Sequence, residues 1–166
     1  MEVQQQITEF KICLIGGPKT GKTTFLTEML TGRVPSQYQP TAGLDVGQLM
    51  INTNYGVYKL VFWDTGGLHT GLGACYYINS HASFAFYGPD QWDLTEEFVT
   101  EYERVDNEGP IINIFTGPAR SHFMEKVCRR IKRRTIYSYH PNKRGYVAPI
   151  LHLLKTLTNH ADLVIV

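Results

Sequence analysis

Apolar residues along this 166-residue chain follow two alternating patterns, short continuous runs and repeats at helical spacing. Short apolar runs are typical of buried strands, and apolar residues three or four positions apart mark one face of a helix. Runs and extended segments predict six strands, at residues 11–15, 43–51, 57–63, 82–87, 111–115 and 135–139. Helical spacing predicts a helix from Phe25 to Leu30, capped by Gly32, and helices at 94–105, 122–131 and 147–157.

The order of these elements indicates the fold class. Strands that alternate with helices predict an α/β domain with a mostly parallel sheet and helices on both faces. The turn Asn54-Tyr55-Gly56 joins two strands directly and predicts one antiparallel pair at the edge of the sheet. Asp93 is the expected N-cap of the helix at 94–105. No repeat, linker or low-complexity tract interrupts the pattern, so we expect residues 1–166 to form a single domain.

A glycine-rich segment between the first strand and the first helix has the pattern G-x-x-x-x-G-K-[ST] of a phosphate-binding loop, or P-loop. Backbone N–H groups and the positive end of the helix converge there on one point, where a polyphosphate can bind. Lys22 adds a charge toward the β- and γ-phosphates, and the Thr23 hydroxyl can ligate Mg²⁺. The sequence therefore predicts a P-loop NTPase fold. Its expected nucleotide-binding residues here are Gly16, Gly17, Pro18, Lys19, Thr20, Gly21, Lys22, Thr23 and Thr24.

Two further segments carry candidate residues for the same site. Asp64 follows the buried strand at 57–63 and can hold Mg²⁺ through water, and Gly67 lets a backbone N–H approach a γ-phosphate. Thr41 lies in the long loop before the second strand and can complete the Mg²⁺ shell when a γ-phosphate is present. Tyr38 in that loop is a candidate catalytic side chain. The expected metal ligands are thus Thr23, Thr41 and Asp64.

Composition narrows the function classes only slightly. A formal net charge of +1 predicts no general attraction to nucleic acid or membranes, and three widely spaced cysteines are typical of reduced thiols inside cells. The six histidines are scattered and predict no metal site. The N-terminus resembles neither a signal peptide nor a myristoylation site, no apolar run is long enough to span a bilayer, and no cysteine near the end invites prenylation. We expect a soluble intracellular protein.

The sequence resembles the Ras-type small GTPases and, within them, the Ran subfamily of nuclear-transport GTPases. The resemblance rests on six short segments: Phe10-Lys11-Ile12, Thr20-Gly21-Lys22-Thr23-Thr24-Phe25, Leu30-Thr31-Gly32, Thr53-Asn54-Tyr55-Gly56, Trp63-Asp64-Thr65 and Tyr76-Tyr77-Ile78. It implies a monomer that binds GTP or GDP with Mg²⁺, in nucleus and cytoplasm.

A basic run falls where Ran proteins have a patch that meets importin-type receptors. Its residues are Arg129, Arg130, Lys132, Arg133 and Arg134. A solvated helix end would explain the same charges, because positive charge is favourable near a helix C-terminus. One basic run in a chain of near-zero net charge supports nucleic-acid binding poorly.

Departures from the family pattern change the expected activity. Leu68 stands where a glutamine orients the attacking water, so we expect very slow hydrolysis and no intact catalytic residue. Gly66 replaces an alanine and is expected to loosen the backbone. The base-reading segment N-K-x-D is replaced by Pro118, Ala119, Arg120 and Ser121, which lack its amide, lysine stem and carboxylate. Lys143 is a candidate substitute for the lysine of the S-A-K element, and the acidic C-terminal tail of Ran proteins is absent.

Three functions are therefore compatible with the sequence. The first is a divergent Ran-like GTP-binding protein that stays in the triphosphate state and engages transport receptors. The second is a pseudo-GTPase, an interaction module that mimics the Ran surface with little nucleotide control. The third is a P-loop NTPase with relaxed base specificity, because phosphate contacts alone do not distinguish ATP from GTP.

Overall fold

A computed structural model gives the fold, and it describes residues 7–67, 73–105, 108–117, 129 and 135–166. The strands are β1 (Thr8–Ile15), β2 (Leu44–Thr53), β3 (Gly56–Thr65), β4 (Ala82–Tyr87), β5 (Ile111–Phe115) and β6 (Ile136–Ser138). The helices are α1 (Lys22–Thr31), α2 (Trp92–Arg104) and α4 (Val147–Thr158), with a short 3-10 helix, η1, at Gly73–Tyr77. The predicted helix at 122–131 lies almost wholly outside the described residues.

The six strands form one sheet in the order β2-β3-β1-β4-β5-β6. Every neighbouring pair is parallel except β2 and β3, which are antiparallel from Leu44↔Thr65 to Thr53↔Gly56. The predicted mostly parallel sheet with one antiparallel pair at its edge is confirmed. Because β1 lies in the middle, the loops that follow β1, β3, β4 and β5 come together at one edge of the sheet.

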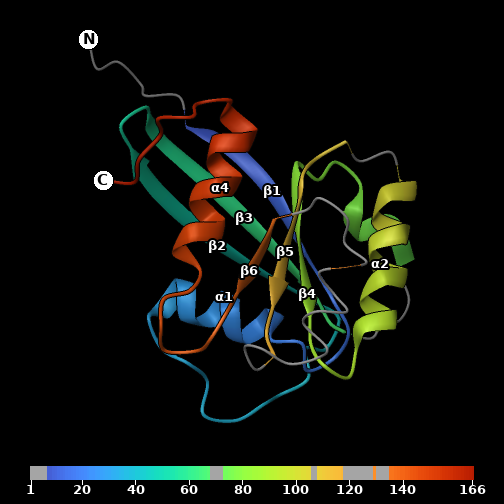
Figure 1. The fold of residues 1–166 in the computed structure, drawn as a ribbon. Coiled ribbons are helices and arrows are strands. Elements are labelled where there is room, and N and C mark those ends of the chain that lie inside the picture. Colours follow the sequence, from blue (N-terminus) through green and yellow to red (C-terminus); the bar gives the residue numbers. More distant parts are fainter. Residues whose placement is uncertain (1–6, 68–72, 106–107, 118–128, 130–134) are drawn as a thin grey trace.

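Two apolar layers cover the two faces of the sheet, as the period-two alternation of strand side chains requires. In β1, Ile12 and Leu14 face the layer that α1 and α4 complete, and Cys13 and Ile15 face the layer that α2 completes. Figure 1 shows α1 and α4 on one side of the sheet and α2 on the other. None of the helices within the described ranges is long and apolar enough to cross a membrane.

One local prediction was wrong, one element was not predicted, and one predicted cap is confirmed. Helix α2 begins at Trp92 with Gln91 as its N-cap residue, so Asp93 lies inside the first turn and is not the cap. Helix η1 was not predicted, because its sequence Gly73-Ala74-Cys75-Tyr76-Tyr77 has no helical repeat long enough to detect. The cap at Gly32 is confirmed: its φ of 70° is left-handed, and its N–H donates to the Glu28 carbonyl.

The chain end packs against the β2–β3 hairpin. Asn54 exchanges two hydrogen bonds with Val164, the Val166 N–H donates to the Asn52 carbonyl, and the Tyr55 ring stacks on His160 at 3.9 Å. The Tyr55 hydroxyl also donates to the Asp162 carboxylate at 2.7 Å. This arrangement adds a short antiparallel bridge to the outer end of β2.

Candidate functional site

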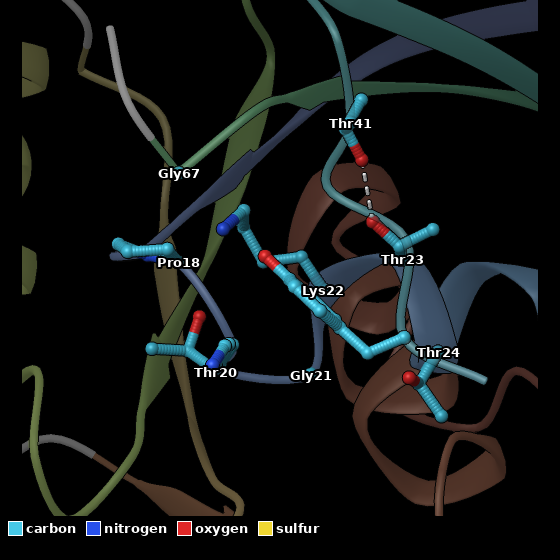
Figure 2. Close-up of a pocket in the computed structure, with 10 residues that line it drawn as sticks. Pro18, Thr20, Gly21, Lys22, Thr23, Thr24, Thr41 and Gly67 are labelled. Atoms are coloured by element: carbon cyan, nitrogen blue, oxygen red, sulfur yellow. Dashed lines mark hydrogen bonds between the residues drawn. The ribbon is translucent and has the colours of Figure 1, made fainter.

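A cavity of about 350 Å³ opens at the edge of the sheet where the loops after β1 and β3 meet. Figure 2 shows the labelled residues around it, with the P-loop on one side and Thr41 and Gly67 on the others. Every lining residue was a candidate from the sequence: Pro18, Lys19, Thr20, Gly21, Lys22, Thr23, Thr24, Tyr38, Thr41 and Gly67. Four other candidates from the sequence do not line the cavity: Gly16, Gly17, Asp64 and Lys143.

The P-loop leaves the start of α1 open toward this cavity. Gly21, the N-cap residue of α1, has a left-handed φ of 91° and makes no side-chain cap hydrogen bond. The first turn of α1 contains no acidic residue. The first N–H groups of the helix therefore have no capping acceptor, and the positive helix end favours an anion. The loop itself is held by the Thr20 hydroxyl, which donates to the Gly17 carbonyl at 2.8 Å.

Lys22 is buried beneath the P-loop. Its ammonium donates to the carbonyls of Gly16 and Gly17 at 2.7 and 2.8 Å. Burial lowers the pKa of Lys22 to about 8, and the Asp64 charge opposes that shift. A buried ammonium with mostly neutral acceptors gains from an added negative charge, so a phosphate in this cavity would supply a missing counter-charge.

Three oxygen-bearing side chains meet at the start of α1. The Thr23 hydroxyl donates to Asp64 Oδ2 at 2.5 Å and lies 2.8 Å from the Thr41 hydroxyl, as the dashed line in Figure 2 marks. Asp64 is fully buried, and within the described part of the chain its Oδ1 has no hydrogen-bond partner. Burial raises the pKa of Asp64, and the Thr23 hydrogen bond and the Lys22 charge oppose that shift.

This oxygen cluster fits Mg²⁺, which prefers oxygen ligands and keeps several waters. The unpartnered Asp64 Oδ1 and the two threonine hydroxyls are the donors that such an ion needs. No three side chains among His, Cys, Asp and Glu come together elsewhere in the described ranges. With one carboxylate and two hydroxyls, the shell would have to be completed by phosphate and water oxygens.

Two consecutive glycines after β3 make the closest backbone contacts of the site. A Cβ on Gly67 would lie 2.2 Å from the Pro18 nitrogen, and a Cβ on Gly66 would lie 2.4 Å from the Thr41 carbonyl oxygen. The Gly66 N–H donates to the Gly43 carbonyl at 3.0 Å. Gly66 was expected to loosen the backbone, but here it allows the loop before β2 and the loop after β3 to touch.

Two threonines that the sequence analysis did not select form hydrogen bonds with the backbone of the P-loop. The Thr116 hydroxyl, directly after β5, donates to the Thr20 carbonyl at 2.9 Å. In α2, the fully buried Thr95 accepts from the Gly17 N–H at 3.3 Å and donates to the Phe86 carbonyl at 3.0 Å. The position of Thr116 at a strand-to-loop junction could have indicated it, whereas nothing in the sequence around Thr95 does.

The end of β5 also changes the register of the base-reading segment. The strand ends at Phe115, so the four positions that follow it are residues 116–119, two earlier than the sequence analysis assigned. The lysine position then falls on Gly117, where a Cβ would lie 2.6 Å from the Phe115 ring. In either register the amide, lysine and carboxylate of N-K-x-D are missing.

The loop after β6 is tied to the core rather than to the cavity. Tyr139 is buried; its N–H donates to the Phe115 carbonyl, and its hydroxyl donates to the Glu28 carboxylate at 2.5 Å. Lys143 lies in the exposed turn that follows. Arg129 is exposed; Leu68, residues 118–121 and the other four basic residues lie outside the described residues.

A comparison with protein families identifies the family to which this P-loop domain belongs. The model of the family described as Roc (Ras of Complex, Roc, domain of DAPkinase) matches residues 11–117, well over half of the chain. The match includes the P-loop, Thr41 and Asp64 and ends at residue 117, two residues after β5. The chain therefore belongs to the Roc family of GTP-binding domains, within the Ras superfamily.

Proposed function

We propose that this domain is a switch protein that binds GTP with Mg²⁺ and retains it, with very slow hydrolysis. The observation that carries the proposal is one cavity lined by Lys22, the uncapped start of α1, Thr23 and Thr41, with Asp64 hydrogen-bonded to Thr23. An anion-binding backbone beside an oxygen cluster matches a polyphosphate with its cation.

Different residues of the site would bind the phosphates and the Mg²⁺ ion. The N–H groups of the P-loop and of the first turn of α1 bind the phosphates, and Lys22 contributes its charge. Thr23, Thr41 and Asp64 would hold Mg²⁺, which would supply positive charge to offset the charge of the phosphates. Thr41 and Gly67 belong to loops that touch each other and the P-loop, so a γ-phosphate between them would favour the contact geometry described above.

Retention of GTP is tested by identifying the bound nucleotide. Protein purified from cells is denatured, and the released nucleotide is separated by chromatography; we expect GTP. Lys22→Ala should lower the affinity for GTP and GDP tenfold to a hundredfold, as the loss of one charged hydrogen bond of about 1.5–3 kcal/mol implies. Lys155→Ala, a change on α4 away from the cavity, serves as the matched control. An empty site together with no micromolar binding would contradict the proposal.

Slow hydrolysis follows from the chemistry of one position. The Leu68 side chain cannot orient water by hydrogen bonding, whereas a glutamine can. We expect Leu68→Gln to raise single-turnover GTP hydrolysis at least tenfold, which corresponds to about 1.4 kcal/mol of transition-state stabilisation. Leu68→Asn is the control, because its shorter amide reaches less far. Equal rates in all three proteins would argue that another group limits hydrolysis.

The missing base-reading side chains support a second candidate, a P-loop protein with relaxed base specificity. In neither register does the segment after β5 supply the amide, lysine and carboxylate that read guanine. Retention of labelled GTP and ATP can be compared directly. A strong preference for GTP would exclude this candidate, and similar affinities would favour it.

A role in nucleocytoplasmic transport rests on the Ran-like segments and the basic run in the sequence. We propose it as the biological setting, in nucleus and cytoplasm, with importin-type receptors as partners of the switch loops and the basic run. Pull-down with such a receptor should depend on bound nucleotide. Capture that persists after nucleotide removal and in Lys22→Ala would instead identify a pseudo-GTPase that mimics the surface.

A further inference from the structure

Lys19 has an unusual backbone conformation for a residue with a long side chain. Its φ is 59°, in the left-handed region that glycine occupies readily and that other residues adopt at a conformational cost. The neighbouring residues explain the geometry: Pro18 lies against Gly67 and Gly21 is the N-cap residue of α1, so the loop must turn sharply between them. The sequence places a cation where a glycine would be less strained.

The side chain of Lys19 lies near the loop before β2. Its ammonium lies 5.6 Å from the centroid of the Tyr38 ring, within cation–π range, and both residues line the cavity. Tyr38 is 53% exposed. Among the described residues, the Lys19 ammonium has no carboxylate partner.

We propose that Lys19 is a second phosphate-binding cation, held over the Tyr38 ring and positioned to bind the terminal phosphate of a nucleoside triphosphate. The inference rests on the proposed nucleotide-binding function. The contacts of Lys19 lie on the γ-phosphate side, because Pro18 touches Gly67 and Tyr38 belongs to the loop of Thr41. A terminal phosphate adds negative charge there, and a cation near it favours the triphosphate over the diphosphate.

Lys19 would also account for retention by a site with a weakened base pocket. The segment after β5 lacks the charged partner for the base, so the phosphates must supply a larger share of the binding free energy. Two lysines line the same cavity, Lys22 against the P-loop carbonyls and Lys19 near the Tyr38 ring, and together they provide that share. The preference should therefore hold for the triphosphate group itself, whatever base it carries.

Substitutions of Lys19 that tolerate its left-handed φ can separate the effect of the lysine charge from the effect of backbone strain. Lys19→Asn and Lys19→Gly remove the charge but tolerate the left-handed φ, and Lys19→Arg keeps the charge. Calorimetry with GTP, GDP and inorganic tripolyphosphate, each with Mg²⁺, gives the affinities. We expect both neutral variants to bind GTP and tripolyphosphate about tenfold more weakly, to lose less than threefold for GDP, and to unfold at no lower urea concentration than the wild type.

The role of Lys19 and nucleotide binding itself can fail separately in these experiments. Equal losses for GTP and GDP, or no loss in Lys19→Asn and Lys19→Gly, would overturn the role of Lys19 and leave nucleotide binding intact. A wild-type protein that binds none of the three probes would overturn the proposed function itself. Wild-type-like affinity in Lys19→Arg supports a role for charge, and a loss as large as in Lys19→Asn would contradict it.

Discussion

Gly67 is the residue on which the closed geometry of the cavity depends most directly. Any side chain there meets the P-loop backbone at Pro18, which cannot yield as a flexible side chain would. The loop after β3 must then move away from the P-loop, and displacements of about 1 Å at a binding site can cost a hundredfold in function.

We therefore expect Gly67→Ala to lower the affinity for GTP tenfold or more, measured by calorimetry, with little change in the free energy of unfolding. Gly32→Ala is the matched control. Gly32 has a left-handed φ of 70°, but a Cβ added to it would meet no atom within 4 Å, so the change should cost about 1–2 kcal/mol of stability and leave affinity unchanged. Unchanged GTP affinity in Gly67→Ala would show that the contact with Pro18 is dispensable.

Tyr139 and Glu28 form the second residue pair with a clear energetic consequence. Both side chains are buried, so removing the hydroxyl leaves a carboxylate with one fewer donor. We expect Tyr139→Phe to lower the free energy of unfolding by about 1–3 kcal/mol in urea denaturation. Tyr137→Phe removes a hydroxyl that is only partly buried against His152, and its effect should stay below about 1 kcal/mol. Equal effects of the two changes would contradict this ranking.

At the scale of elements, the hairpin β2–β3 and the segment after α4 stabilise each other. Tyr55 contributes its ring to the stack on His160 and its hydroxyl to Asp162. We expect Tyr55→Ala to speed hydrogen exchange at the amides of Val164 and Val166, and Tyr55→Phe, which keeps the ring, to have a smaller effect. Exchange as slow as in the wild type would mean that the backbone bridge alone holds the segment.

The same contact sets a pH dependence with a defined sign. The Tyr55 hydrogen bond lowers the pKa of Asp162 below its ordinary value of 3.8. A group whose pKa is lowered by folding stabilises the fold above its unfolded pKa and loses that contribution as pH falls through the folded value. The protection of the Val164 amide, relative to its intrinsic exchange rate at each pH, should fall below about pH 4 in the wild type and change less in Tyr55→Phe.

Much of the fold could be predicted because its signals are local. The apolar run before the P-loop and the turn Asn54-Tyr55-Gly56 each report on neighbours in the sequence, and both gave the strands observed. Lys22, Thr23, Thr41 and Asp64 could be selected because their chemistry suits phosphate and Mg²⁺. Thr95 and the partners of Tyr55 could not, because they act through residues 78 and 107 positions away that no local pattern connects.

At the scale of the whole molecule, bound Mg²⁺ and nucleotide should act as one ligand. The Asp64 carboxylate is buried without a full set of partners, so the oxygen cluster gains from the ion and the ion gains from the phosphates. We expect chelation with EDTA to accelerate GTP release at least tenfold and to lower the melting temperature of the GTP-loaded protein. Release at the same rate with and without EDTA would show that the phosphates are held by the P-loop alone.

The bridge between Thr53 and Ile165 also has a consequence for how the protein is made. Asn54 pairs with Val164, 110 residues later, so this end of β2 stays uncovered until residue 164 has been synthesised. The rest of the outer edge of β2 has no strand beside it within the described sheet, and Val46 and Met50 on that strand are exposed. Nascent chains should therefore expose this end of β2 to other chains until residues 164–166 pair with it.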